Sequence, residues 1–277
     1  MTYLEEYFMN NHFQTKKARD DYKREVSALL EYTEKDNLTD ITRRDAQAYR
    51  DYMLTKYSKN TIYKKLRILN AVFNYFNDEY AITNPFKDIS IPERELNITN
   101  FTEEDRIAVM LRKARGNSMR DLVFILLAYR LGLYASTIQS LKISDVKVTD
   151  GLEYAITLYS GTSKEVLVAL PKDINPYFHQ FFVTRVTNHV GLDNLFITST
   201  HKPYSDNYAW RQLRKYDKTI TFTELRRLAA TKMLASGVDI DNIQETLGIG
   251  PHWAFRYAEA VAYLNASPAE GTYSCEF

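Results

Sequence analysis

The segment of residues 222–257 constrains the fold of this 277-residue chain more than any other part of it. Its first half carries apolar residues at helical spacing, which predicts a helix with one apolar face. The residues that recur at this spacing are Leu225, Leu228, Ala229 and Met233. Arg226 and Arg227 lie away from that face, and we interpret them as a buried arginine pair.

Two glycines mark the ends of two helices in this segment. Gly237 and Gly248 each follow the last apolar residue of a periodic run, where helices commonly end. Asp239 or Asp241 can cap the second helix. A third helical segment then carries Tyr257 back toward the corner between the first two helices. The segment therefore predicts a tight two-helix corner that holds an arginine pair and a tyrosine.

The composition is that of a soluble globular protein. Hydrophobic residues make up 45% of the chain and charged residues 26%, and the formal net charge is +1. A chain of this length can bury a core in each of two domains. We find no signal peptide and no apolar run long enough to span a bilayer, and the single cysteine, Cys275, excludes an internal disulfide. We therefore expect a cytosolic protein in which any DNA contact comes from local basic faces.

Residues 2–88 read as all-helical. Thr15 can cap a first helix and Ser58 a third. Thr42 starts the second, with Asp45 at the position where Glu or Gln would complete a capping box. We expect the third helix to end at residues 84–85, because the residue before a proline is pushed out of the helical region.

One face of the third helix is basic and polar. Long cationic side chains beside amides and hydroxyls suit contacts with phosphates and with a DNA groove. An ordinary solvated helix face would have the same composition. The residues of this face are Lys59, Asn60, Thr61, Tyr63, Lys64, Lys65 and Arg67.

The pattern changes after this helical region. Pro92 and alternating charge argue against regular structure in residues 89–100. We set the boundaries at 1–90 for a first domain, 91–101 for a linker and 102–277 for a second domain, with Thr102 as the first N-cap.

The second domain combines helices with three short extended segments. We expect helices over 121–134, 174–190 and 207–215, and extended segments over 143–148, 154–159 and 166–170. The helix over 207–215 carries Arg211, Arg214 and Lys215.

These segments resemble the tyrosine recombinases, the phage integrase family. The run "TELRRLAATKMLASGVDIDNIQETLGIG", followed by "FRYAEA", keeps the spacing of the family's His-x-x-Arg, Gly-Val-Asp, Leu-Gly-His and Arg-Tyr pattern. "LTDITRRDAQAYRDYM", "SKNTIYKKLRILNAVFNYF" and "NPF" resemble its helical core-binding domain. The resemblance implies a mainly α fold, with a SAM-like helical domain and a catalytic-type α+β domain that holds a three-stranded antiparallel sheet. It also implies a double-stranded DNA partner gripped by both domains, with the basic helix of the first domain in the major groove.

The resemblance implies chemistry without metal or cofactor. A tyrosine attacks the DNA phosphate, two arginines stabilise the transition state, a hairpin lysine protonates the leaving oxygen, and histidines assist. Arg226 and Tyr257 match retained positions, and Lys164 matches the lysine only if the hairpin register shifts, since strict register puts Gly161 there. The vacated positions are the first arginine, now Tyr134 in "LGLYAST", and the two histidine-type positions, now Thr223 and Ile249.

Each lost donor that was positioned toward the phosphate costs roughly 3–4 kcal/mol of transition-state stabilisation. We therefore interpret the chain as a sequence-specific DNA-binding protein with a decayed active site, in which Tyr257 is a packing residue. A phage or mobile-element transcriptional repressor or an accessory factor, in the cytoplasm of a bacterial or phage-infected cell, fits this interpretation. Besides the basic helix of the first domain, the expected DNA contacts are Arg211, Arg214, Lys215, Arg226 and Arg227.

Two other interpretations remain open from the sequence. An active but divergent recombinase, forming a 3′-phosphotyrosine at Tyr257, would recruit other side chains to the vacated roles. The candidates for these roles are Lys164, Arg130, His252 and Trp253. A plain helix-turn-helix over residues 225–247 would bind DNA through the second domain alone. We also expect the tail, residues 262–277, to support self-association.

Overall fold

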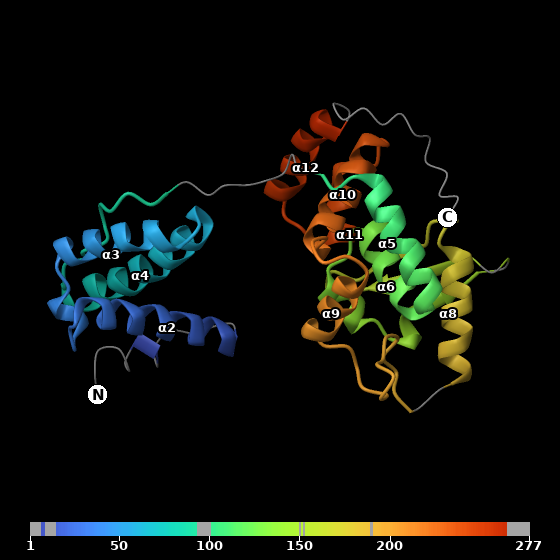
Figure 1. Cartoon of the computed structure of the whole chain (residues 1–277), viewed down its shortest axis with the longest axis horizontal. Coiled ribbons are helices and arrows are strands. Elements are labelled where there is room, and N and C mark those ends of the chain that lie inside the picture. The colour runs from blue at the N-terminus through green and yellow to red at the C-terminus, as the bar shows by residue number, and fades with distance from the viewer. Residues whose placement is uncertain are drawn as a thin grey trace. The chain divides into compact units, whose positions relative to one another are not determined.

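The computed structural model describes residues 7–8, 15–92, 101–149, 151, 153–188 and 191–264. The chain divides into two compact units, residues 1–96 and 97–277, which are described separately below (Figure 1). Much of the linker expected at 91–101 and most of the C-terminal tail lie outside the described residues.

The first unit is a packed group of helices. Its elements are α2 (Lys16–Thr33), a 3-10 turn (Leu38–Asp40), α3 (Arg43–Lys56) and α4 (Lys59–Tyr80). All three α-helices contact one another (Figure 1). Helix α4 contributes more core residues than α2 or α3, including Ile62, Leu66, Phe73 and Phe76. Ile89 and Ile91, which follow the helices, also pack against this core.

Side chains cap two of these helices as the sequence predicts. Thr15 accepts a hydrogen bond from the Ala18 amide at 3.1 Å. Thr42 and Asp45 form a complete capping box, so an aspartate serves here in place of Glu or Gln. Ser58 precedes α4 but makes no side-chain capping bond to the described residues of that helix.

The end of α4 differs from the prediction. The helix stops at Tyr80, where Ala81 adopts a left-handed conformation, four residues before Pro85. The segment after the helix is held against α4 by Asn84. The side-chain amide nitrogen of Asn84 donates to Asn70 Oδ1 and to Asn74 Oδ1, each at 2.7 Å.

The second unit is mainly helical around a small sheet. Its helices are α5 (Glu104–Asn117), α6 (Met119–Arg130), α7 (Ala135–Ser140), α8 (Asn175–Thr187), α9 (Asp206–Tyr216), α10 (Phe222–Ala235), α11 (Ile240–Leu247) and α12 (Pro251–Leu264). Strands β1 (Val146–Val148), β2 (Tyr154–Leu158) and β3 (Val166–Ala169) form an antiparallel sheet in the order β1-β2-β3. The predicted fold class is therefore confirmed.

Helix α6 forms the centre of this unit. Its residues from Asp121 to Tyr129 are all buried, and it contacts α5, α8 and α10. Its one buried acid, Asp121, accepts hydrogen bonds from the hydroxyls of Tyr204 and Tyr216 at 3.0 and 2.8 Å. These bonds satisfy a carboxylate that would otherwise be costly to bury.

Several predicted boundaries in the second unit are wrong by a few residues. Helix α6 ends at Arg130, because Gly132 takes a positive φ of 65°. The first strand starts only at Val146, since residues 143–145 form a 3-10 turn. Glu103, not Thr102, is the N-cap residue of α5.

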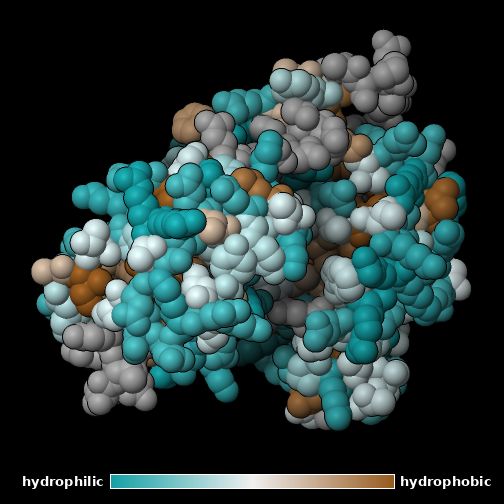
Figure 2. Space-filling view, turned by 60° about the vertical axis from the view of Figure 1, so that its left-hand side comes forward, coloured by the Kyte–Doolittle hydropathy of each residue, from teal (hydrophilic) through white to brown (hydrophobic). Residues whose placement is uncertain are grey.

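The surface view in Figure 2 shows a mainly hydrophilic face with small, separate hydrophobic spots. None of the helices in the described part of the chain is long and apolar enough to cross a membrane.

Candidate nucleic-acid interface

Arg226 lies at the centre of the corner that the sequence predicted. Its side chain on α10 is only 1% exposed. Nη1 donates to the carbonyl of Gly132 at 2.7 Å, and Nη2 donates to the carbonyl of Leu247 at 2.6 Å. The guanidinium thereby joins the end of α6 to the end of α11, while Nε has no hydrogen-bond partner among the described residues.

Tyr134 covers the guanidinium of Arg226. The centre of its ring lies 3.6 Å from Arg226 Cζ, which is a close cation–π contact. Tyr134 is the N-cap residue of α7 and is 46% exposed. Solvent therefore meets the tyrosine ring here, while the guanidinium stays buried beneath it.

Tyr257 reaches the same corner from α12. It is 6% exposed, packs with Ile243 and Leu247, and lies 6.1 Å from the Trp253 ring, centroid to centroid. Burial raises the pKa of its hydroxyl, while the charge of Arg226 and a hydrogen bond to it act in the opposite direction. The structure thus brings Tyr257 to Arg226, but within a packed apolar cluster.

The second arginine of the predicted pair is less buried than Arg226. Arg227 is half-buried, and its Cζ lies 5.6 Å from the centre of the Phe101 ring. Burial lowers the pKa of its guanidinium, and the charges of Glu224 and Tyr257 oppose this shift. Only one member of the pair is therefore fully enclosed, which corrects the prediction of two buried arginines.

The two residues predicted to match the family's histidine positions lie in different settings. Thr223 is exposed in the first turn of α10, and Ile249 packs against the apolar cluster around Tyr257. His252 is exposed and accepts a hydrogen bond from Arg256 Nε at 3.3 Å. Of these two residues, only Thr223 has a polar side chain.

Arg130, the last residue of α6, forms an ion pair. Its Nε lies 2.9 Å from a carboxylate oxygen of Asp173, in the segment before α8.

Lys164 lies in the hairpin between β2 and β3. It is exposed and lines a hollow of about 600 Å³ together with Lys142 and Tyr159. Tyr159 also belongs to the Arg226 corner, because its hydroxyl donates to the Thr246 carbonyl at 3.3 Å. Burial raises the pKa of that hydroxyl, and the charge of Arg226 lowers it. Sequence reasoning missed Tyr159, because it continues a strand pattern and matches no motif position.

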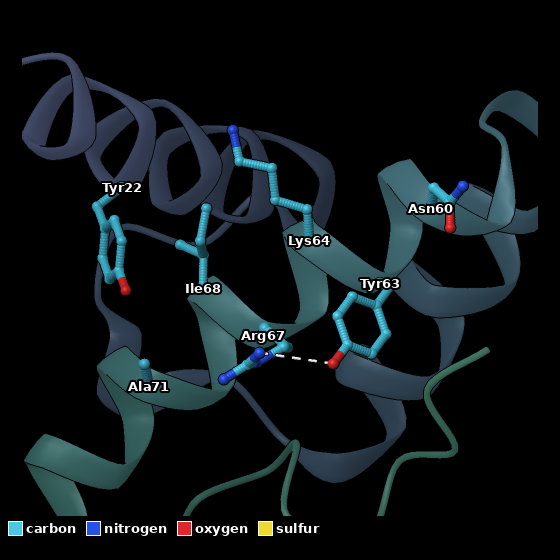
Figure 3. Close-up of a pocket in the computed structure, with 7 residues that line it drawn as sticks. All are labelled: Tyr22, Asn60, Tyr63, Lys64, Arg67, Ile68 and Ala71. Atoms are coloured by element: carbon cyan, nitrogen blue, oxygen red, sulfur yellow. Dashed lines mark hydrogen bonds between the residues drawn. The ribbon is translucent and has the colours of Figure 1, made fainter. Parts of the chain in front are cut away.

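The basic face of α4 is partly neutralised within the first unit. Lys64 Nζ lies 2.7 Å from Asp21 and Lys65 Nζ 2.5 Å from Glu25, both acids of α2. Arg67 instead donates from Nη1 to the Tyr63 hydroxyl at 3.5 Å (Figure 3). Lys59, Asn60 and Thr61 are exposed in the first turn of the helix.

Helix α9 carries the other predicted basic group. Arg211, Arg214 and Lys215 are its members, and Arg214 and Lys215 lie in the last turn of the helix. Arg214 Cζ stacks 3.8 Å from the centre of the Trp210 ring, and Trp210 is itself exposed. The structure therefore keeps this group at the surface of the second unit.

No group of three or more His, Cys, Asp or Glu side chains suited to a metal ion occurs among the residues that the structure describes.

The fold defines a two-unit helical protein of the tyrosine recombinase class. Residues 100–250, more than half of the chain, match the Phage integrase family, and the chain belongs to that family.

The relatives and solved structures agree with this assignment. A tyrosine recombinase of Agathobacter rectalis is 29% identical over 229 residues, which cover 74% of this chain and 72% of the relative. The tyrosine recombinase XerD of Staphylococcus epidermidis is 24% identical over 269 residues, which cover 89% and 90%.

Two solved structures share the fold. A lambda integrase dimer bound to a COC′ core site aligns with a TM-score of 0.73 and 16% identity, over 99% of this chain and 98% of that one. The Tn1549 transposon integrase in complex with transposon right end DNA aligns with a TM-score of 0.70 and 16% identity, over 97% and 100%. At this identity the likeness concerns the fold alone.

Proposed function

We propose that this protein binds double-stranded DNA at specific sites and does not cleave it. Its role is that of a transcriptional repressor or an accessory factor of a phage or mobile element, in the cytoplasm of a bacterial or phage-infected cell. Family membership supports the DNA partner, because relatives are named recombinases and similar folds have been solved with DNA. The basic groups on α4 and α9 supply the cations that such binding needs.

The observation that carries the proposal is the pairing of Tyr134 with Arg226. Phosphoryl transfer requires donors aimed at the charge that develops on the phosphate. Here both terminal nitrogens of Arg226 already donate to backbone carbonyls, and the Tyr134 ring covers the guanidinium. A tyrosine supplies no positive charge at the position that matches the first arginine. Each missing donor costs roughly 3–4 kcal/mol of transition-state stabilisation, or two to three orders of magnitude in rate.

The second candidate is an active, divergent recombinase. The observation in its favour is that Tyr257 lies against Arg226, so nucleophile and one arginine are still together. It requires the N–H donors of Arg226 that do not bond to carbonyls to reach a phosphate, although the Tyr134 ring covers the guanidinium. It also requires a second cation, and Arg130 is held by Asp173.

A capture experiment separates the two candidates. Fragments of the source genome are bound to the immobilised full-length protein, and half of the sample is washed natively and half under denaturing conditions. A Tyr257→Phe variant, which removes only the hydroxyl, is treated in parallel.

We expect specific fragments in the native half, none in the denatured half, and the same fragments with the variant. DNA that survives denaturation with the wild type, and not with Tyr257→Phe, would establish a recombinase and overturn the proposed lack of cleavage. The absence of any specific fragment would remove DNA binding itself.

Self-association through the C-terminal tail belongs to the same proposal. Phe255 and Tyr263 on α12 are exposed apolar side chains close to where the tail begins. Removal of residues 265–277 should change the oligomeric state or the DNA affinity in analytical ultracentrifugation and binding assays. If both stay the same, the tail has no such role.

A further inference from the structure

We infer that Arg67, held in place by Tyr63, reads a guanine base, whereas its neighbours Lys64 and Lys65 mainly join α4 to α2. This inference rests on the proposed DNA binding and adds the residue that sets sequence specificity. It separates side chains that share one helix face and look equivalent in the sequence.

Lys64 and Lys65 each have a carboxylate partner on α2, at 2.7 Å from Asp21 and 2.5 Å from Glu25. Lys65 is also largely buried, with 14% of its side chain exposed, and its Nζ lies 4.8 Å from the centre of the Tyr57 ring. A phosphate would have to compete with these acids. The competition is strongest at Lys65, because the Lys64 side chain is 61% exposed and an exposed ion pair is weak.

Arg67 is exposed and contacts Tyr63, one turn earlier. Its Nη1 lies 3.5 Å from the Tyr63 hydroxyl, and its Cζ lies 5.7 Å from the centre of the ring. The carboxylates of the first unit's described residues form no ion pair with it. One of the five guanidinium N–H donors of Arg67 faces the Tyr63 hydroxyl. The other donors can form hydrogen bonds with a DNA base.

Arg67 and Tyr63 line a hollow of about 450 Å³ beside α4. Asn60, one turn earlier in the helix, Lys64, and Tyr22 of α2 line it as well. Figure 3 shows the Tyr63 hydroxyl directed at the Arg67 guanidinium. Residues 60, 63 and 67 follow the i, i+3, i+7 spacing of one helix face. An arginine on this helix face can lie in the plane of a DNA base rather than against the DNA phosphate backbone.

The chemistry selects guanine. A guanidinium is a planar fork that matches O6 and N7 of guanine in the major groove, the commonest specific contact of arginine with DNA. Tyr63 limits the rotamers of Arg67, so less side-chain entropy is lost when the base is bound. A lysine lacks both the fork and the pairing geometry.

The test uses the full-length protein and a randomised duplex library, from which bound sequences are selected and read. Arg67→Gln, Arg67→Lys and the matched control Lys64→Gln are compared with the wild type, and thermal unfolding verifies that all four are equally folded. Affinities are then measured on the selected site and on the same site with 7-deazaguanine, which lacks the N7 acceptor, at each G in turn.

We expect one G of the wild-type motif to be lost in the motif of Arg67→Gln, while Lys64→Gln keeps the whole motif. At that G, 7-deazaguanine should weaken the wild type roughly 5- to 150-fold and leave Arg67→Gln unchanged. Arg67→Lys should keep only a part of the preference.

Two results would overturn the inference. One is an unchanged motif with uniformly weaker binding by Arg67→Gln, which would make Arg67 a phosphate contact. The other is a loss of the same G in Lys64→Gln. If the wild type selects no motif, the proposed DNA binding fails as well, so the two failures are distinguishable.

Discussion

Among the single residues, Arg226 has an internal structural role. The position retained from the family pattern is buried, and its donors connect Gly132 and Leu247, which lie 94 and 21 residues away in the chain. Tyr134 completes this arrangement by covering the guanidinium.

Replacement of Arg226 by methionine should therefore destabilise the second unit. Two buried carbonyls would lose their donors, and each unsatisfied group costs about 1–3 kcal/mol. We expect the free energy of unfolding to fall by about 2–5 kcal/mol in urea titrations. Arg211→Met, an arginine on the surface of α9, is the control and should change it by less than about 0.5 kcal/mol. Equal effects of the two variants would mean that Arg226 has no structural role.

Among the helices, the positions of their ends decide where the corner residues lie. Gly248 ends α11 at a φ of 61°, and a Cβ there would lie 2.7 Å from the Tyr159 hydroxyl. The left-handed conformation and the close approach both require glycine at this position.

Gly237 offers a matched comparison for this helix end. It has a φ of 83° and open space where a Cβ would lie, so Gly237→Ala reports backbone strain alone. We expect Gly248→Ala to reduce the free energy of unfolding by about 1–3 kcal/mol more than Gly237→Ala, because it adds overpacking. Similar losses in denaturant titrations would show that Tyr159 moves aside freely.

The start of α3 predicts a pH effect. The hydrogen bond from Lys35, followed by those from Thr42, lowers the pKa of Asp45 to about 2. The unfolded-state pKa of an aspartate is ~3.9, so the stabilisation is present above that pH and is lost as the pH falls toward about 2.

Asp45→Asn should therefore reduce hydrogen-exchange protection of the first turn of α3 at pH 7. It should also lose less protection than the wild type between pH ~4 and about 2. Asp20→Asn, an exposed position on α2, should follow the wild-type profile. If hydrogen-exchange protection in Asp45→Asn depended on pH as it does in the wild type, the capping box would not be the cause of the pH effect.

Across the molecule as a whole, each unit contributes its own basic group to the proposed function. The α4 group depends on Arg67, which the acids of α2 leave without an ion pair, and the α9 group adds three cations at the surface of the second unit. In the alternative interpretation, a plain helix-turn-helix over residues 225–247, DNA binding would require only the second unit.

If both units contact one duplex, the two groups should differ in their salt dependence. Neutralising Arg211, Arg214 and Lys215 to Gln should reduce the slope of log K against log salt by ~0.9 for each phosphate that is no longer neutralised. Arg67→Gln should weaken specific binding with little change in that slope. Fluorescence anisotropy over a salt series measures both, and an unchanged slope in the triple variant would exclude α9 from the interface.

Local patterns in the sequence were enough to predict the helical layout, the small sheet and most helix starts. Such patterns, for example Thr42 with Asp45 or Gly248 after Leu247, act over a few residues. Predicted boundaries failed where a distant contact took part, as at Asn84, which bonds to Asn70 and Asn74 across the end of α4.

The availability of individual side chains, in contrast, depends on how distant elements pack. Lys64 is paired with Asp21, 43 residues earlier, and Arg226 with carbonyls on two other elements. The sequence could place these residues on helix faces, because periodicity is local. It could not determine their partners, because charges and donors pair only once the tertiary structure brings those elements together.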